Sequence, residues 1–285
     1  MAPVGETLAR YDLHRIQQTI KWIVYALLLV NFGFYFYEDW QRAFLTLGSD
    51  ASLVDWAGEF ATSIDEAAWF ILLFMFELET YILEDEDWKG WVASLVRGVR
   101  IVCFAMIAHT VIAYGDTVVE YSATVPIEDA QSLCSLADSG ATWVYNLEYT
   151  EIDEANCSTL TESDRYFRLG EHQLVTSEDG LRLERRLAWV DVIEASAWLL
   201  IILAIEAVVW LQERGISRSG VITAANAVKT TLYLLLFGFA GYWALLGHWL
   251  YAWDEVLWIA GFWAIELNVR EWRDELAGAA GPSAD

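Results

Sequence analysis

Basic residues are scarce in this sequence. Lysine and arginine together number 17 among 285 residues, against 41 aspartates and glutamates, which gives a formal net charge of −24 at pH 7 and a pI near 4.3. Such a chain repels nucleic-acid phosphates and anionic lipid headgroups, so we expect no nucleic-acid partner. Two explanations of the acidity stay open: a halophilic adaptation that keeps the surface hydrated in salt, and an acidic vestibule that concentrates cations.

The motifs that carry most enzyme chemistry are also missing. The sequence has no His-Glu-x-x-His, no Gly-x-Ser-x-Gly, no glycine-rich phosphate loop and no cysteine pair with zinc-ligand spacing. The four histidines are scattered and show no paired spacing for haem. We therefore expect that the protein is not an enzyme and that it holds no resident cofactor or metal.

Apolar residues, by contrast, are abundant. They make up 56% of the chain, which is more than an ordinary soluble domain carries, and 16 residues are tryptophan. The tryptophans suit the aromatic belts found at membrane–water interfaces. We predict an all-α integral membrane protein in the lipid bilayer. Its six transmembrane helices are expected near 21–38, 57–83, 98–119, 188–211, 224–247 and 249–269.

The positions of the basic residues predict the orientation of these helices. Most of the basic residues outside the long 120–187 segment precede the first helix, connect helices two and three or four and five, or follow the sixth. All of these connections fall on one side. The positive-inside rule then places both termini in the cytoplasm. We expect a multi-pass protein of a prokaryotic plasma membrane, without a cleaved signal peptide.

Residues 120–187 have the composition of a small soluble domain, which the topology places outside the cytoplasm. We expect an α+β insertion: a helix over Pro126–Ala137, a strand over Tyr145–Ile152, and a hairpin turning at Asp179-Gly180 within QLVTSEDGLRLER. The domain division is then 1–119 with three spans, 120–187, 188–269 with three spans, and a cytoplasmic tail, 270–285, expected to be disordered.

Two of the three cysteines lie in this insertion. Cys134 and Cys157 would both face an oxidising compartment, so we predict a disulfide between them. Cys103, within the third predicted span, reads as a small apolar core residue.

A repeated pattern links the three even-numbered helices. WFILLFMFE at 69–77 is echoed by WLLIILAIE at 198–206 and WIAGFWAIE at 258–266, so a Trp is followed eight positions later by a Glu each time. A second Glu precedes each Trp by three or four residues. The pattern predicts three tandem helical hairpins. We call Glu66, Glu194 and Glu255 the outer acids, and Glu77, Glu206 and Glu266 the inner acids.

The spacing of these acids makes them candidate ion-pathway residues. About ten uncharged helical residues span roughly 15 Å, which is half of a hydrocarbon core of about 30 Å. At least one carboxylate per even helix should therefore lie below the membrane surface, where it needs a cation, a proton or water. The outer acids could form a cation entry above an apolar constriction, or lie solvated at the headgroups.

The inner acids have candidate charge partners at the starts of the odd helices. Lys21, Arg100 and Lys229 would lie at the same cytoplasmic level as these carboxylates, so the inner acids could form ion pairs instead of lining a path. His109 could relay protons near neutral pH, or be a hydrogen-bonded packing residue.

One stretch resembles a known family. Asn31, followed by IDEAAWFILLFMFELE at 64–79, is similar to the first two helices of voltage-sensor domains in cation channels, which also carry an intramembrane Asn and a Glu after an aromatic run. The sensor helix itself is not matched, because Arg97 and Arg100 come one helix early and number only two. The sequence also has no recognisable selectivity filter, so we assign no family.

The sequence thus predicts a membrane transport protein: a channel or transporter for monovalent cations, protons among them. Its alternative is a sensor or assembly scaffold that transports nothing and whose extracytoplasmic domain binds a partner or ligand. We also expect a homo-oligomer, since most oligomers are cyclic assemblies of one chain.

Overall fold

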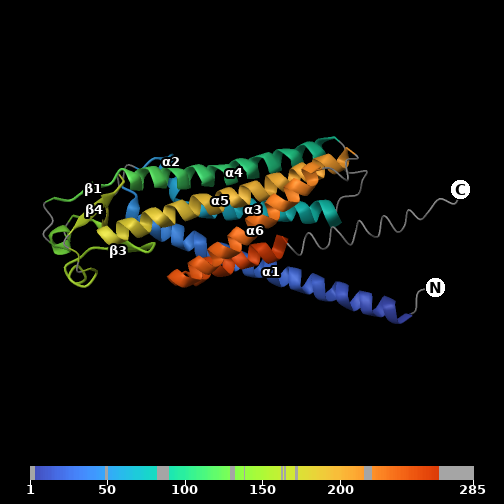
Figure 1. Ribbon diagram of the computed structural model, residues 1–285, viewed down its shortest axis with the longest axis horizontal. Helices are drawn as coiled ribbons and strands as arrows, with labels where there is room; N and C mark the ends of the chain where they lie inside the picture. The colour runs from blue at the N-terminus through green and yellow to red at the C-terminus, as the bar shows by residue number, and fades with distance from the viewer. Residues whose placement is uncertain are drawn as a thin grey trace. The chain divides into compact units, whose positions relative to one another are not determined.

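The computed structural model is mostly helical with one small sheet (Figure 1). It describes residues 4–48, 51–81, 90–128, 132–137, 139–161, 163, 165–170, 173–214 and 220–262. The helices are α1 (Val4–Thr46), α2 (Leu53–Glu59), α3 (Ala61–Tyr81), α4 (Trp91–Ser122), α5 (Glu178–Glu213) and α6 (Gly220–Leu246), with a further helical stretch over 249–262. The chain divides into two compact units, Met1–Gly33 with Tyr233–Asp285, and Phe34–Leu232.

Four of these helices are long and apolar enough to cross a membrane. They are Gln18–Thr46 of α1, Trp91–Ser122, Glu178–Val208 of α5 and Gly220–Leu246. The sequence predicts six spans. The structure supports a membrane protein and finds four helices that are suited to cross the bilayer. α3 is long enough, but it carries the carboxylates Asp65, Glu66, Glu77 and Glu79, which is more charge than the apolar windows of the four spans hold. The sixth predicted span, 249–269, is described only as far as residue 262. Glu266 and the tail at 270–285 lie outside the described residues.

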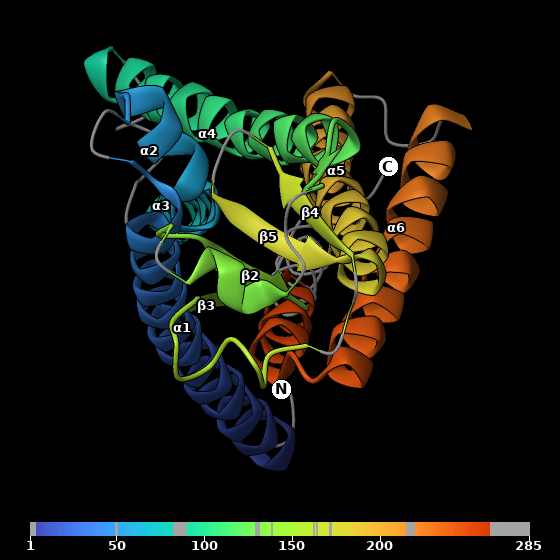
Figure 2. The same ribbon diagram turned by 90° about the vertical axis from the view of Figure 1, so that its left-hand side faces the viewer.

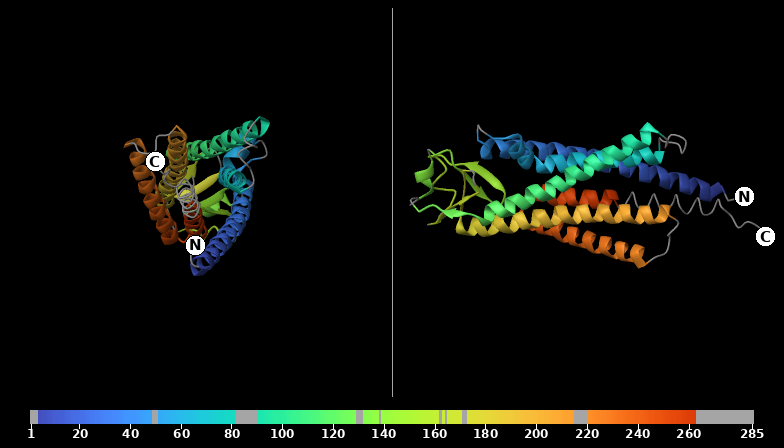
Figure 3. Two further views of the ribbon diagram at one scale, coloured as in Figure 1. Left: turned by 90° about the vertical axis from the view of Figure 1, so that its right-hand side faces the viewer. Right: turned by 90° about the horizontal axis from the view of Figure 1, so that it is seen from above.

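A five-stranded sheet lies where α4 ends and α5 begins (Figures 2 and 3). Its strands are β1 (Val125–Pro126), β2 (Thr142–Tyr145), β3 (Glu148–Glu151), β4 (Tyr166–Leu169) and β5 (Leu174–Ser177), in the spatial order β1-β4-β5-β2-β3. All neighbours are antiparallel except β2 and β5, which pair in parallel with Thr142 opposite Leu174.

The two faces of the sheet bury two different clusters. On one face, Trp143 and Val175 pack in a cluster that includes Cys157. Their neighbours in sequence, Val144 and Leu174, pack against the helices instead. This alternation follows from the two-residue period of a β-strand, and it covers the second face with α4 and α5. Helix α3, α4 and α5 belong to the same unit, with α4 packed against both of the others.

The predicted disulfide is confirmed. Cys134 and Cys157 are bridged, with their Cα atoms 4.9 Å apart, and the bridge ties a short 3₁₀ helix, Leu133–Leu136, to the loop after β3. The longer helix predicted over Pro126–Ala137 is wrong in the described part, because Pro126 belongs to β1 and only this single 3₁₀ turn is helical.

The predicted hairpin at Asp179-Gly180 is wrong. β5 ends at Ser177 and α5 begins at the next residue, with Glu178 and Asp179 in its first turn. The Gly180 N–H donates to Ser177 Oγ over 3.1 Å, which is how a serine satisfies the open end of a helix. A glycine is needed here because a Cβ would collide with Thr176 Oγ1. Acids favour a helix N-terminus as well as a turn, which made the pattern ambiguous.

The strand predicted over Tyr145–Ile152 is interrupted by a turn. β2 ends at Tyr145 and β3 starts at Glu148, so Asn146 and Leu147 form a two-residue connection, with φ of 56° and 60°. Two consecutive positive φ angles are typical of the hairpin turn that matches strand twist. A run with strand composition therefore folds back on itself.

Helix α5 holds both the sheet and the end of α4. The fully buried Glu184 accepts the Leu147 N–H of the hairpin turn over 3.3 Å. One residue on, Arg185 Nε donates to the Tyr121 carbonyl over 2.6 Å, and its Nη2 donates to the Ser122 carbonyl over 3.2 Å. These carbonyls end α4, where a cation is favoured by the unpaired acceptors and the helix dipole. Burial also raises the pKa of Tyr149 in the adjoining cluster, so its phenol stays neutral.

Candidate functional site

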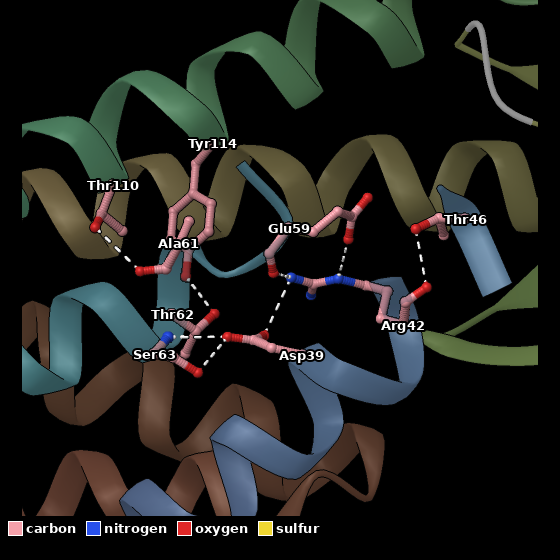
Figure 4. A network of polar contacts seen from close by, with 9 residues as sticks. All are labelled: Asp39, Arg42, Thr46, Glu59, Ala61, Thr62, Ser63, Thr110 and Tyr114. Atoms are coloured by element: carbon pink, nitrogen blue, oxygen red, sulfur yellow. Dashed lines mark hydrogen bonds and ion pairs between the residues drawn. The ribbon is translucent and has the colours of Figure 1, made fainter. Parts of the chain in front are cut away.

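A network of polar side chains joins α1, α2 and α3 on the side of the sheet (Figure 4). Its centre is Arg42, near the end of α1. The guanidinium lies 3.1 Å from Asp39 one turn earlier and 2.7 Å from Glu59, the last residue of α2. Arg42 also donates to the Glu59 carbonyl, so one side chain fixes the end of α2 against α1. The pair is partly exposed on the arginine side and nearly closed off at Asp39, which is 2% exposed.

Asp39 binds the start of α3 as well. Its Oδ2 accepts the Ser63 N–H over 2.9 Å and the Ser63 hydroxyl over 2.7 Å. Ser63 is the third residue of α3, where backbone N–H groups have no partner within the helix. A carboxylate at this position satisfies the open donor and interacts favourably with the helix dipole. Asp39 therefore acts as a cap supplied by a different helix.

Helix α4 contributes hydroxyl groups to the same region. The hydroxyls of Tyr114 and Thr62 are 2.9 Å apart, and Thr110 Oγ1 donates to the Ala61 carbonyl over 3.3 Å. We call Asp39, Arg42, Glu59, Thr62, Ser63, Asp65 and Tyr114 the polar network.

Two tryptophans of the repeated pattern contact each other farther along α3 and α5. Trp69 of α3 and Trp198 of α5 contact edge to face, with their ring centroids 5.7 Å apart. The Trp69 Nε1–H donates to Asp65 over 3.0 Å, so its orientation is fixed by the network. Helices α3 and α5 both run away from the sheet (Figure 1). The Trp–Trp contact thus aligns the repeat segments of the two helices at one level.

This alignment orders the candidate acids of α3 and α5. Glu66 and Glu194 precede the two tryptophans by about one turn, or roughly 5 Å, on the sheet side of the Trp–Trp contact. Glu77 and Glu206 follow the tryptophans by eight residues, or about 12 Å, on the other side. Glu66 is buried, and the other three are partly buried.

The third outer acid belongs to the other unit. Glu255 is buried in the helical stretch 249–262, next to Asp254, which accepts a hydrogen bond from the Asn31 amide over 2.9 Å. Asn31 lies in the first predicted span, so this contact ties that span to the last one within the unit. A ring of all three outer acids stays a prediction.

Of the candidate charge partners, Arg100 pairs with an inner acid. Arg100 Nη1 lies 3.9 Å from Glu206 Oε1, with both side chains about a third or more exposed. An exposed pair at this distance contributes at most about 1 kcal/mol. Lys21 is buried and lies 5.7 Å from the centroid of the Trp22 ring, and Lys229 is partly buried. His109 is partly buried, and its Nδ1 has no hydrogen-bond partner among the described residues.

Sequence reasoning missed the centre of this network. The sequence patterns single out none of Arg42, Asp39 and Tyr114. The available signal was the three-residue spacing of Asp39 and Arg42, which places their side chains on one helix face. Comparisons with known protein families, with curated protein sequences and with solved structures find no match for this chain.

Proposed function

We propose that this chain is a membrane transport protein that moves monovalent cations, protons among them, along a path between α3 and α5. The observation that supports it is the Trp69–Trp198 contact, which has an outer acid on one side and an inner acid on the other in both helices. Carboxylates attract cations, and an apolar constriction between two acidic levels is a recurring way to gate their passage. The polar network lies at the sheet-side entrance of this path.

The proposal includes six membrane-spanning helices in three tandem hairpins. The four apolar helices support it, and so does the placement of two acids of α3: Asp65 accepts a hydrogen bond from Trp69, and Glu66 is buried within the protein and not exposed on the outer surface of the helix. A helix with several acids can cross hydrocarbon when they face protein groups or water. The orientation proposed from the basic residues, with both termini in the cytoplasm, and the homo-oligomer belong to the same proposal.

Flux through liposomes tests the proposed transport. Purified protein is reconstituted with a pH-sensitive dye inside, and a potassium gradient with valinomycin sets the membrane potential. The variant Glu66→Gln/Glu194→Gln removes two outer charges while keeping side-chain shape. Its matched control is Glu148→Gln/Glu151→Gln, which removes two exposed charges from β3. We expect slower proton or cation flux in the first variant alone. Equal flux in both variants, at equal thermal stability, would refute the outer acids as pathway residues.

A second variant tests the constriction. Trp69→Ala removes the edge-to-face contact with Trp198 and the hydrogen bond to Asp65. If the rings close the path, flux at zero applied potential should rise. A folded Trp69→Ala protein that conducts no faster than the unmodified chain would exclude the ring pair as the gate.

The alternative function is a sensor or assembly scaffold, and the paired charges favour it. Arg42 is bound to two carboxylates and Arg100 lies near a third, which are arrangements that stabilise a bundle without any transport. In this case the liposomes show no flux. Glu206→Gln should then cost at most about 1 kcal/mol, and adding Arg100→Gln should cost no more, because both changes remove the same exposed pair.

A further inference from the structure

Helix α2 has an apolar face that no described part of the protein covers. Leu53 is 88% exposed, Val54 is 77% exposed, and Trp56 is 38% exposed. Such side chains on one short helix are unusual on a surface that faces water. The helix is nevertheless well formed, because Ser52 and Asp55 make a reciprocal capping box at its start.

The acids of α2 lie on its other face. Asp55 and Glu59 are four residues apart, which places them about 40° apart around the helix. Glu59 points to the protein, where it binds Arg42, and Asp55 accepts the Ser52 N–H. Leu53 lies opposite the acids with Val54 on one side of it, and Trp56 lies at the other edge of this apolar arc, about 60° from Glu59. The ion pair with Arg42 therefore fixes the roll of α2, so that the apolar arc is turned outward.

An aromatic cluster connects this arc to α1. The Trp56 ring stacks on Phe60 at 6.0 Å between centroids, and Trp40 of α1 contacts both rings at 6.4 Å. Phe36, one turn before Trp40, contacts Phe60 at 5.5 Å. Trp40 is 52% exposed and belongs to the candidate membrane span Gln18–Thr46. The apolar arc of α2 is thus continuous with the surface that a spanning α1 presents to lipid.

We propose that α2 lies in the membrane interface on the sheet side, with Leu53, Val54 and Trp56 inserted among lipid headgroups and upper acyl chains. This rests on the part of the proposed function that has α1 crossing the membrane, and not on cation transport. An amphipathic helix with an aromatic girdle, whose outward arc through Leu53 and Val54 carries no charge, fits this position. The occupant of the arc is lipid, and the pair between Arg42 and Glu59 holds the helix in the plane of the interface.

Spin labels test this placement in nanodiscs of zwitterionic lipid. The full chain with Cys103→Ala keeps its disulfide, and single cysteines at Leu53 or Val54 are labelled with a nitroxide. Two matched positions calibrate the signal: Phe44→Cys on the exposed face of the α1 span for lipid, and Glu148→Cys on β3 for water. Collision with oxygen reports lipid, and collision with a water-soluble nickel chelate reports water.

We expect the labels at Leu53 and Val54 to resemble the Phe44 position, with a ratio of oxygen to nickel collisions several-fold above that at Glu148. A ratio equal to that at Glu148 would place α2 in water and overturn the proposal. Spin–spin broadening or low collision with both reagents would show a second copy or another protein on the arc, and would overturn it as well. The result of this test does not depend on whether the protein transports ions, because the labels report the position of α2 and not transport.

Discussion

Replacing Asp39 by Asn should destabilise the protein strongly, although Asn has nearly the same shape as Asp. The carboxylate accepts three hydrogen bonds, two from Ser63 and one from Arg42. An Asn oxygen directed at Ser63 keeps two of them as neutral bonds, and its amide then faces the guanidinium as a second donor. A hydrogen bond to a charged group contributes about 1.5–3 kcal/mol. Arg42 keeps its bond to Glu59 and is partly exposed, so the loss stays below the cost of a fully isolated buried charge.

The expected loss is therefore about 2–3 kcal/mol in free energy of unfolding, or about 5–10 °C in the unfolding midpoint of a chain of this size. Thermal unfolding in mild detergent, followed by intrinsic fluorescence, measures it. Ser63→Ala supplies the second arm of a double-mutant cycle, since it removes only the hydroxyl donor to Asp39. We expect the two changes to couple by about 1–2 kcal/mol. A coupling of zero, or an Asp39→Asn protein as stable as the unmodified chain, would refute Asp39 as the cap of α3.

Three further substitutions test the sheet and its attachment. Replacing Cys134 and Cys157 by Ser should cost about 3 kcal/mol because it frees the unfolded chain, and denaturant titration measures this; no loss would contradict it. Leu147→Gly should stabilise the β2–β3 turn by up to about 1 kcal/mol because glycine adopts positive φ without strain, seen as slower hydrogen exchange at β3. Arg185→Met should cost about 1–2 kcal/mol and speed exchange over the last turn of α4, whereas unchanged exchange there would show that the arginine does not cap it.

The helices and the disulfide could be predicted because each depends on a local or compositional signal. Long apolar runs specify a spanning helix through length and hydropathy alone, and two cysteines in one soluble segment have few pairing choices. The insertion was harder because its short elements depend on tertiary contacts. Ser-Glu-Asp-Gly at 177–180 serves equally as a turn or as the start of a helix, and the packing of Gly180 against Thr176 selects the helix. Asn146 and Leu147 turn where Glu184 of a distant helix accepts a turn N–H.

The candidate site was only partly predictable for the same reason. The Trp–Glu repeat identified the residues that align α3 with α5, since equal spacing in two parallel helices places equivalent residues at equal depth. The polar network did not follow from the repeat. Ser63 is a partner of Asp39 only because α3 starts against the end of α1, and no spacing within either helix specifies that approach. Partners more than twenty residues apart in sequence need the fold to bring them together.

The direct passage from β5 into α5 has a mechanical consequence. Ser177 is the last residue of the strand and Glu178 the first of the helix, so no loop can absorb a displacement between them. β5 is flanked on both sides, antiparallel to β4 and parallel to β2. Tension along α5 would load the hydrogen bonds of both ladders in shear, all at once, and would not peel them apart one after another. A force applied to the disulfide-bonded domain would therefore be transmitted directly to α5, the helix that carries Trp198.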